Sequence, residues 1–380
     1  MRHKAPALRF ASFAAGLLIL AAQGAVGDDG LQKDMRPSIA PDIREDELEV
    51  KLQRGDFVVV PIPTSNPTLG TGLVGGAAYF YSQSEEQKSI QPASLTGIGG
   101  LYTDNDSKAL AIVQQNYWRS NKWRFTGAAG AADLRLSLLS PDGAGSFAQL
   151  DWRVKGQFAY ARVSGQVRPN WYAGLLGRLV DAKQSLETPL DIPEFDLIDQ
   201  PYTSSIGLGI YAEYDTRDMP TNAYSGRYLK AEALFNDESI GSKRTYQNYS
   251  LTFNSYHQLS DSLVIAWQLQ GCTRGGRVPL WDACTVKLRG FAATDYLGTS
   301  SYSGQVEARW RLSERWGLAG FGGGGYSLNA LGQADGRDAV ESYGAGIRFM
   351  VLKSKRVNMR LDFARSGDSE AIHFTVGEAF

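Results

Sequence analysis

The sequence predicts an all-β protein: a transmembrane antiparallel β-barrel of sixteen strands. Three observations predict it: an N-terminal export signal, many glycines and aromatic residues, and a long series of segments in which apolar and polar residues alternate. The 42 glycines, 18 tyrosines and 8 tryptophans are typical of outer-membrane barrels. A periplasmic β-sandwich is the alternative, but it would not need so many apolar faces turned outward.

The N-terminal segment, residues 1–27, has the pattern of a secretory signal peptide. Basic residues precede an apolar run at 10–22, and small residues at 25–27 offer a cleavage site. No later apolar run approaches the roughly 20 residues that a membrane helix needs, so any membrane span must be a strand. Residues 28–55 are charged and are predicted to be a periplasmic linker, and residues 56–380 are predicted to form the barrel.

The strand prediction rests on residues that alternate with a period of two, apolar toward lipid and polar toward the lumen. Alternate connections are short, as periplasmic turns must be, and the long connections at 181–203, 272–301 and 327–341 fall in the other set. The connections 83–93 and 215–225 are longer than this scheme expects, but no helical segment is predicted in them. The predicted strands cover residues 57–63, 71–82, 94–103, 108–117, 123–134, 151–163, 170–180, 204–214, 226–235, 245–259, 262–271, 302–312, 316–326, 342–352, 357–365 and 371–380.

Composition and motifs argue against several functional classes. The net charge is −1, so no basic surface indicates nucleic-acid binding. The three histidines are far apart, and neither a zinc-protease motif nor a serine-hydrolase motif occurs, so we expect no enzyme, no metal site and no cofactor. An acidic stretch within the predicted extracellular loop 181–203 could hold cations or could simply be solvated; it contains Asp191, Glu194, Asp196 and Asp199.

The only two cysteines, Cys272 and Cys284, fall in the same predicted extracellular loop. Export to an oxidising compartment predicts a disulfide between them, and two separate thiols are the alternative. A bridge would close a short loop and stiffen the base of the long one.

A charged residue in an apolar setting stands near the end of the 272–301 loop. Arg289 follows Leu288 and precedes Gly290 and Phe291. Its guanidinium keeps its charge and carries five donors, so inside a barrel it must meet a carboxylate or water. Gly290 allows a backbone turn where a Cβ would clash. Read alone, the motif is also compatible with a solvated surface arginine.

With these features in place, the sequence resembles the BamA/TamA family of outer-membrane assembly proteins, also called the bacterial surface antigen family. Four segments carry the resemblance, which covers about residues 54–380. They are the loop motif Leu288, Arg289, Gly290 and Phe291, a turn motif with Asp215, Thr216, Arg217 and Asp218 followed by Pro220 and Gly226, the opening from Pro61 to Gly70, and a terminal assembly signal that includes Phe374, Val376, Gly377 and Phe380.

The resemblance implies a barrel that assists the insertion or translocation of proteins at the outer membrane, with its long extracellular loop folded inward as a plug. It also implies a weak seam between the first and last strands. It also implies contact with outer-membrane lipids, with the host barrel-assembly machinery during biogenesis, and with client or partner proteins. The alternative is a passive narrow pore or a membrane anchor for a partner protein. Family members usually carry periplasmic POTRA modules, and the sequence has none, so the resemblance is to a member without them.

A second departure from the family concerns the partner of Arg289. Members often carry a Phe-x-Asp on the strand two after the loop, but here Phe321 is followed by two glycines. On the first strand after the loop, Glu307 shares the lumen-facing side with Arg309 and Arg311. We therefore predict that Glu307 pairs with Arg289. The alternative is that Glu307 pairs only with the two neighbouring arginines.

Overall fold

A computed structural model describes residues 55–66, 68–141, 147–186, 202–328, 337–353, 356–367 and 369–380. The predicted signal peptide, the predicted linker up to residue 54 and the acidic stretch at 191–199 lie outside the described residues.

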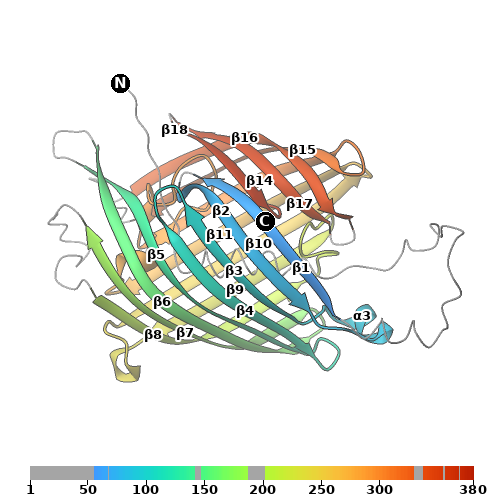
Figure 1. The fold of residues 1–380 in the computed structure, drawn as a ribbon, viewed down its shortest axis with the longest axis horizontal. Helices are drawn as coiled ribbons and strands as arrows, with labels where there is room; N and C mark the ends of the chain where they lie inside the picture. Colours follow the sequence, from blue (N-terminus) through green and yellow to red (C-terminus); the bar gives the residue numbers. More distant parts are fainter. Residues whose placement is uncertain are drawn as a thin grey trace, which may run out of the picture.

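The described chain forms one large antiparallel sheet that curves around a central axis (Figure 1), which confirms the all-β prediction. Each predicted strand segment overlaps an observed strand. The strands of the sheet are β1 (Asp56–Asn66), β2 (Gly70–Phe80), β3 (Leu95–Thr103), β4 (Lys108–Trp118), β5 (Trp123–Pro141), β6 (Phe147–Arg168), β7 (Trp171–Leu186), β8 (Tyr202–Asp215), β9 (Gly226–Asn236), β10 (Tyr246–Ser260), β11 (Leu263–Gly276), β14 (Ser300–Arg311), β15 (Trp316–Leu328), β16 (Arg337–Leu352), β17 (Val357–Ser366) and β18 (Ser369–Val376).

Strands that follow one another in the chain are neighbours in this sheet, except where β14 follows β11. In the connection between β11 and β14, the two-residue strands β12 (Cys284–Thr285) and β13 (Leu297–Gly298) pair with each other. Two one-turn 3-10 helices lie in loops, η1 (Glu238–Ile240) and η2 (Leu280–Asp282). The connection between β11 and β14, residues 277–299, is called the inner loop below.

The first strand is held very differently on its two sides. β1 pairs with β2 along its whole length, from Asp56 opposite Phe80 to Asn66 opposite Gly70. On its other side, β1 and β18 share one residue pair among the described residues: Ser65 lies opposite Phe374. This weakly paired boundary is called the seam.

The last strand is shorter than predicted, because it ends at Val376 and not at the predicted residue 380. Gly377 has a φ of +93°, a conformation that glycine adopts readily and that turns the chain out of the strand. Its N–H donates to the carbonyl oxygen of Asn358 at 2.7 Å. The final residues therefore leave the sheet, which also limits how far β18 can pair with β1.

The prediction that no helix interrupts the strands was wrong for the connection 83–93. This connection contains α3 (Glu85–Ile90), which lies near the start of β1 in Figure 1. Ser84 and Gln87 form a reciprocal capping box at its N-terminus, and this pattern is visible in the sequence. None of the described helices is long and apolar enough to span a membrane.

Apolar side chains cover much of the outer face of the sheet. Leu175 is 69% exposed, and Leu208 and Ile210 are each 59% exposed, although they lie within β7 and β8. A soluble protein rarely exposes so large a contiguous apolar surface. Exposed tryptophans near the strand ends, such as Trp123 and Trp316, are placed like an interfacial aromatic girdle.

The polarity of the two faces reverses along β6. Near its C-terminal half, Ala159, Ala161 and Val163 are exposed on the outer face. Nearer its start, the exposed outer positions are Asp151, Arg153, Lys155 and Gln157, while Trp152 and Val154 are buried inside. The same reversal occurs on β5 and β7. The sheet therefore extends beyond its apolar band, and this extension encloses apolar side chains, as an ordinary soluble core does.

Candidate functional site

The inner loop lies inside the sheet, as the sequence predicted. Every residue from Val278 to Gly298 is buried or half-buried. Long loops normally run over a protein surface, because their backbone polar groups need partners. This loop instead contacts the sheet wall at three kinds of site: a disulfide, an apolar core and two clusters of charged residues.

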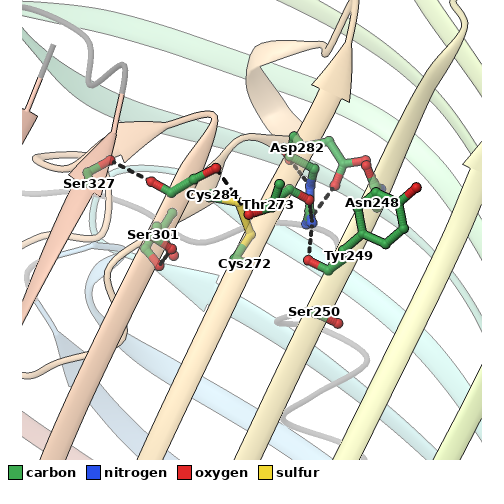
Figure 2. Close-up of a disulfide and its surroundings, with 12 residues drawn as sticks. Asn248, Tyr249, Ser250, Cys272, Thr273, Asp282, Cys284, Ser301 and Ser327 are labelled. Carbon is green, nitrogen blue, oxygen red and sulfur yellow. Dashed lines mark hydrogen bonds and ion pairs between the residues drawn. A yellow bond between two sulfur atoms is a disulfide. The ribbon is translucent and has the colours of Figure 1, made fainter.

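The predicted disulfide is confirmed. Cys272 on β11 is bonded to Cys284 at the start of β12, with 5.8 Å between their Cα atoms (Figure 2). Cys284 is fully buried, and its strand pairs with β13, where Gly298 lies opposite. The bridge therefore ties the beginning of the inner loop to the wall from which it emerges.

Just before the bridge, the inner loop carries a carboxylate surrounded by donors. This Asp282 cluster consists of Asp282, Arg178, Arg274, Tyr246 and Asn248. Arg178 donates through both terminal nitrogens, one of them to Oδ1 at 3.1 Å. The Tyr246 hydroxyl and the Asn248 amide donate to Oδ2 at 3.0 and 2.8 Å. Figure 2 shows Asp282 beside Asn248.

The charged residues around Asp282 stabilise the ionised form of its carboxyl group. Burial alone would raise the pKa of Asp282, but the charges of Arg178 and Arg274 outweigh it and hold this pKa below its ordinary value of 3.8. Arg274 also donates to the main-chain oxygen of Asp282 at 2.9 Å. The cluster therefore fixes both the side chain and the backbone of the loop.

Apolar residues of the inner loop fill the extended part of the sheet. Leu280 and Trp281 directly precede Asp282 and are 2% and 6% exposed. They belong to one buried core with wall residues of β5, β6 and β7, which include Leu134, Trp152 and Val180. The polarity reversal on these strands provides the apolar inner face on which the loop packs.

In the middle of the inner loop, Arg289 lies against another part of the wall, formed by β14 and β17. Its Nη1 lies 2.7 Å from Oε2 of Glu307 on β14 and 2.9 Å from Oδ2 of Asp362 on β17. Its Nη2 donates to Gln305 at 3.3 Å, and its guanidinium carbon lies 3.3 Å from the centroid of the Phe321 ring. The predicted contact with Glu307 is present, and Arg289 is not a surface residue.

The two carboxylates that bind Arg289 are themselves surrounded by wall arginines. Glu307 accepts from Arg309 at 2.8 Å, and Arg348 lies 3.5 Å away. Asp362 accepts from Arg348 at 2.6 Å and from Arg360 at 2.8 Å. These six residues form the Arg289 cluster. Both carboxylates are 0% exposed, so their charges are compensated almost entirely by these arginines.

Sequence reasoning missed Asp362 as a partner of Arg289. The signal was the alternation along β17, which places Asp362 on the inner face with Asn358 and Arg360. What the sequence lacked was the distance across the lumen, because β17 lies far from the loop in the chain. Arg311, which shares the predicted face with Glu307, instead donates to the main-chain oxygen of Asp261 at the rim.

The residues that follow Arg289 explain why the motif contains glycine and an aromatic residue. Gly290 has a φ of +103°, and a Cβ there would lie 3.0 Å from the backbone of Arg365. Phe291 packs edge-on against Tyr296, with 4.7 Å between the ring centroids. Leu288 and Phe291 also belong to a small buried core with Val340 of β16. The motif therefore turns the chain tightly against the wall.

The turn motif between β8 and β9 forms its own compact structure. Arg217 forms two hydrogen bonds to Asp215, at 2.9 and 2.8 Å, and donates to the main-chain oxygen of Pro220 at 3.3 Å. Asp218 accepts from two backbone N–H groups at the far side of the turn. Thr216 leaves no room for a Cβ at Gly226, which has a φ of +102°. The motif is therefore placed as a structural turn. In the same connection, Asn222 accepts from Arg309 of the Arg289 cluster at 3.5 Å.

The C-terminal residues lie partly inside the sheet. Glu378 accepts from Arg348 at 2.9 Å and from Asn358 at 2.6 Å. Arg309 donates to the main-chain oxygen of Phe380 at 2.8 Å, and the Phe380 ring packs beside Ala223, Tyr256 and Ala266.

These contacts link the chain end to the arginines of the Arg289 cluster. Of the other predicted signal residues, Phe374 stands at the seam, Val376 ends β18 and Gly377 forms the turn. A role in assembly stays a prediction for this set.

We expect the disulfide to contribute to stability. Replacing both Cys272 and Cys284 with serine should lower the free energy of unfolding by about 3 kcal/mol, the value for closure of a short loop. Unfolding by urea in detergent, followed by tryptophan fluorescence, measures this change. Wild-type protein unfolded with reductant is the matched control. Equal stability of the serine variant and the oxidised wild type would contradict the expectation.

The described chain is an antiparallel sheet that curves around its own buried loop. This arrangement is typical of barrel proteins with an internal plug. No family model matches the sequence, and no curated protein matches it. The fold is similar to that of BamA from Haemophilus ducreyi lacking POTRA domains 1–3, with a TM-score of 0.61 and 13% identity over 86% of this chain and 70% of that chain.

Two further solved structures are similar. CdiB from Escherichia coli has a TM-score of 0.56 and 10% identity over 84% of this chain and 62% of that chain. CdiB from Acinetobacter baumannii has a TM-score of 0.54 and 13% identity over 86% of this chain and 60% of that chain. The chain therefore spans less than two thirds of either CdiB chain. The predicted BamA-like fold is confirmed.

Proposed function

We propose that the protein is an integral outer-membrane barrel, closed from sixteen strands, that assists the insertion or translocation of other proteins at the outer membrane. The BamA-like fold, the exposed apolar outer face and the sequence resemblance to the assembly family support this proposal. The observation that carries this proposal is the seam. The first strand, β1, pairs with β2 along its whole length but meets the last strand, β18, at one residue pair, Ser65 and Phe374, among the described residues.

The seam leaves strand edges available for another chain. Because β18 ends at Val376, the residues of β1 near Asp56 extend past the end of the last strand. Unpaired strand edges template pairing with an added strand, and the main-chain hydrogen bonds give affinity for it. Pro61 and Pro63 lack N–H donors, so β1 can offer fewer hydrogen bonds to β18 than an ordinary strand. A client strand would enter at this edge.

The filled interior argues against a passive pore. The inner loop is fixed at Asp282 and at Arg289, and the space between it and β5, β6 and β7 is a packed apolar core. Ion flow through the barrel would require this loop to leave its site. A barrel that is plugged inside and weakly paired at one edge is better suited to lateral transfer of a strand than to conduction.

The proposal predicts that locking the seam abolishes activity. A variant with Ser65→Cys and Phe374→Cys can form a bridge, because opposed residues of antiparallel strands have the Cα separation that a disulfide needs. After oxidation, we expect at least about tenfold slower insertion of an unfolded barrel protein into liposomes that contain the variant, because the client strand cannot enter. The heat-modifiable gel shift of the client measures insertion, and reductant should restore it.

The matched control is Ser65→Cys with Thr71→Cys, which bridges β1 to β2 and leaves the seam free. This control also accounts for reduction of the native disulfide. Equal insertion by the two oxidised variants would refute a role for the seam. If wild-type protein inserts no client but conducts ions in planar bilayers, the passive-pore alternative is correct instead.

A further inference from the structure

Three exposed lysines lie in one row on the outer face of the sheet. Lys108 on β4 stands opposite Asp133 on β5, Asp133 opposite Lys155 on β6, and Lys155 opposite Lys183 on β7. All three lysines are exposed. With about 4.8 Å between neighbouring strands, the row spans roughly 14 Å. We call Lys108, Lys155 and Lys183 the lysine row.

The lysine row marks one boundary of the apolar outer band. On β4 and β5, the apolar outward positions end at Leu110 and Ala131, one outward position from the row. On β6 and β7, they end at Ala159 and Leu179, two outward positions from it. This stepwise change is what strand tilt produces, since a row of paired residues is inclined to the membrane plane. The long loops lie at this end of the sheet, so the row belongs to the outer-leaflet side.

The charges in the row are poorly compensated within the protein. Lys155 and Lys183 are directly opposed, and like charges at opposed positions of neighbouring strands destabilise a sheet. Asp133 stands between Lys108 and Lys155 and attracts both charges, but its two oxygens accept from Arg153 at 2.7 Å, so one carboxylate is shared among three basic side chains. In the described ranges, no carboxylate lies within 4.0 Å of any of the three ammonium groups. An external anion would relieve the repulsion.

We propose that the lysine row binds the phosphate groups of a phosphorylated glycolipid in the outer leaflet. The row lies where the headgroups of that leaflet would meet the barrel, and its charge is complementary to phosphate. The apolar residues below it, such as Leu110 and Leu179, would contact the acyl chains. This inference rests on the outer-membrane location proposed above, but not on any role of the seam.

The proposal is tested with purified protein in neutral detergent micelles. The probe is bisphosphorylated lipid A, and bound lipid is counted by native mass spectrometry across a concentration series. Replacing Lys108, Lys155 and Lys183 with glutamine should weaken binding on the order of 100-fold, since each basic side chain near an anionic surface contributes roughly fivefold. The matched control replaces three exposed basic residues at the other end of the strands, Lys122, Arg168 and Arg227, with glutamine.

Comparison lipids separate the possible sources of binding. Lipid A without phosphates and phosphatidylglycerol should both bind wild-type protein at least about tenfold more weakly, because neither offers phosphates spread over a sugar headgroup to the whole row. Equal binding of phosphate-free lipid A, or equal loss of binding in both glutamine variants, would overturn the proposal. If inorganic phosphate alone displaces lipid A from the protein, the row is an anion site without lipid specificity. That result would also contradict the proposal.

A second variant distinguishes a ligand site from a structural one. Lys183→Glu places opposite charges on facing strands, so it should raise the unfolding temperature slightly while lowering the affinity for lipid A. A purely structural role of the row predicts no loss of lipid affinity in this variant. Loss of lipid A binding with a normal heat-modifiable gel shift would support the site independently of the insertion assay. Failure of that assay alone would leave the lipid site standing.

Discussion

Glu307→Ala should destabilise the protein more than Arg289→Ala, although the two side chains form one ion pair. Glu307 is 0% exposed and contacts Arg289, Arg309 and Arg348, so its removal leaves three buried guanidinium groups short of a partner. Removing one partner of a buried pair costs about 3–5 kcal/mol, and we expect this range for Glu307→Ala. Arg289→Ala should cost about 1.5–3 kcal/mol, because Glu307 and Asp362 keep their wall arginines.

The two variants should also differ in which part of the molecule they destabilise most. Arg289→Ala should leave the sheet folded but free the part of the inner loop around residue 289, so that protease cleavage of the loop and ion conductance both rise. Glu307→Ala should lower the urea midpoint of the sheet further than Arg289→Ala does, and tryptophan fluorescence follows this unfolding. Arg289→Lys should rescue only in part. Nη1 alone reaches both carboxylates, but lysine lacks the second nitrogen that donates to Gln305 and the planar group that stacks on Phe321.

A double-mutant cycle tests whether the pair acts through its direct contact. Arg289→Ala should cost less in the Glu307→Ala background than in wild type, with the remainder due to Asp362. Arg311→Ala is the control, because Arg311 is exposed on the same strand and donates to a main-chain oxygen. Additive effects of Arg289→Ala and Glu307→Ala would contradict the predicted coupling, and unchanged loop protection in Arg289→Ala would remove its role in fixing the loop.

The strands could be predicted from the sequence because each depends on a local pattern. Alternation along β14 placed Glu307 inside without knowledge of any other strand. The disulfide followed from two cysteines in one exported loop. The inward-folded loop followed from the family resemblance, because Arg289 read alone also fits a solvated surface. These inferences needed residue type and spacing, and not the distances between distant segments.

The elements that could not be predicted depend on contacts between distant segments. Asp362 reaches Arg289 only because β17 comes close to the inner loop across the lumen. The last strand ends early because Glu378 and Phe380 find partners on β14 and β16, which outweigh the alternation that favoured a longer strand. The Asp282 cluster draws on β7, β10 and β11 at once, and nothing local marks Asp282 as buried.

Asp282→Ala should release the beginning of the inner loop and expose the core beneath it. The substitution leaves Arg178 and Arg274 buried without their carboxylate, and the Tyr246 hydroxyl and the Asn248 amide lose an acceptor. We expect a loss of about 3–5 kcal/mol in the stability of this part of the molecule. Amide hydrogen exchange of residues 278–284 measures it, and protection there should fall by at least about 100-fold, while the central strands stay protected.

Asp282→Asn separates charge from shape, because it keeps the acceptor oxygen and removes the charge. It should fall between wild type and Asp282→Ala. Asp106→Ala is the matched control: Asp106 pairs with Arg135 at 2.8 Å, but their side chains are 58% and 52% exposed, so its loss should cost less than about 1 kcal/mol.

The pH dependence of loop protection gives an independent check on the charge of Asp282. Because the pKa of this carboxyl is lowered in the folded protein, its stabilising effect is present above the ordinary value of 3.8 and is lost as the pH falls through the lower folded value. Protection of residues 278–284 should therefore persist at pH 4 in wild type and decline only in stronger acid. In Asp282→Asn this acid-dependent decline should be absent from the segment, since no charge remains to be neutralised. A decline of the same size in both proteins would show that another group controls the loop, and that the contacts of Asp282 do not hold it in place.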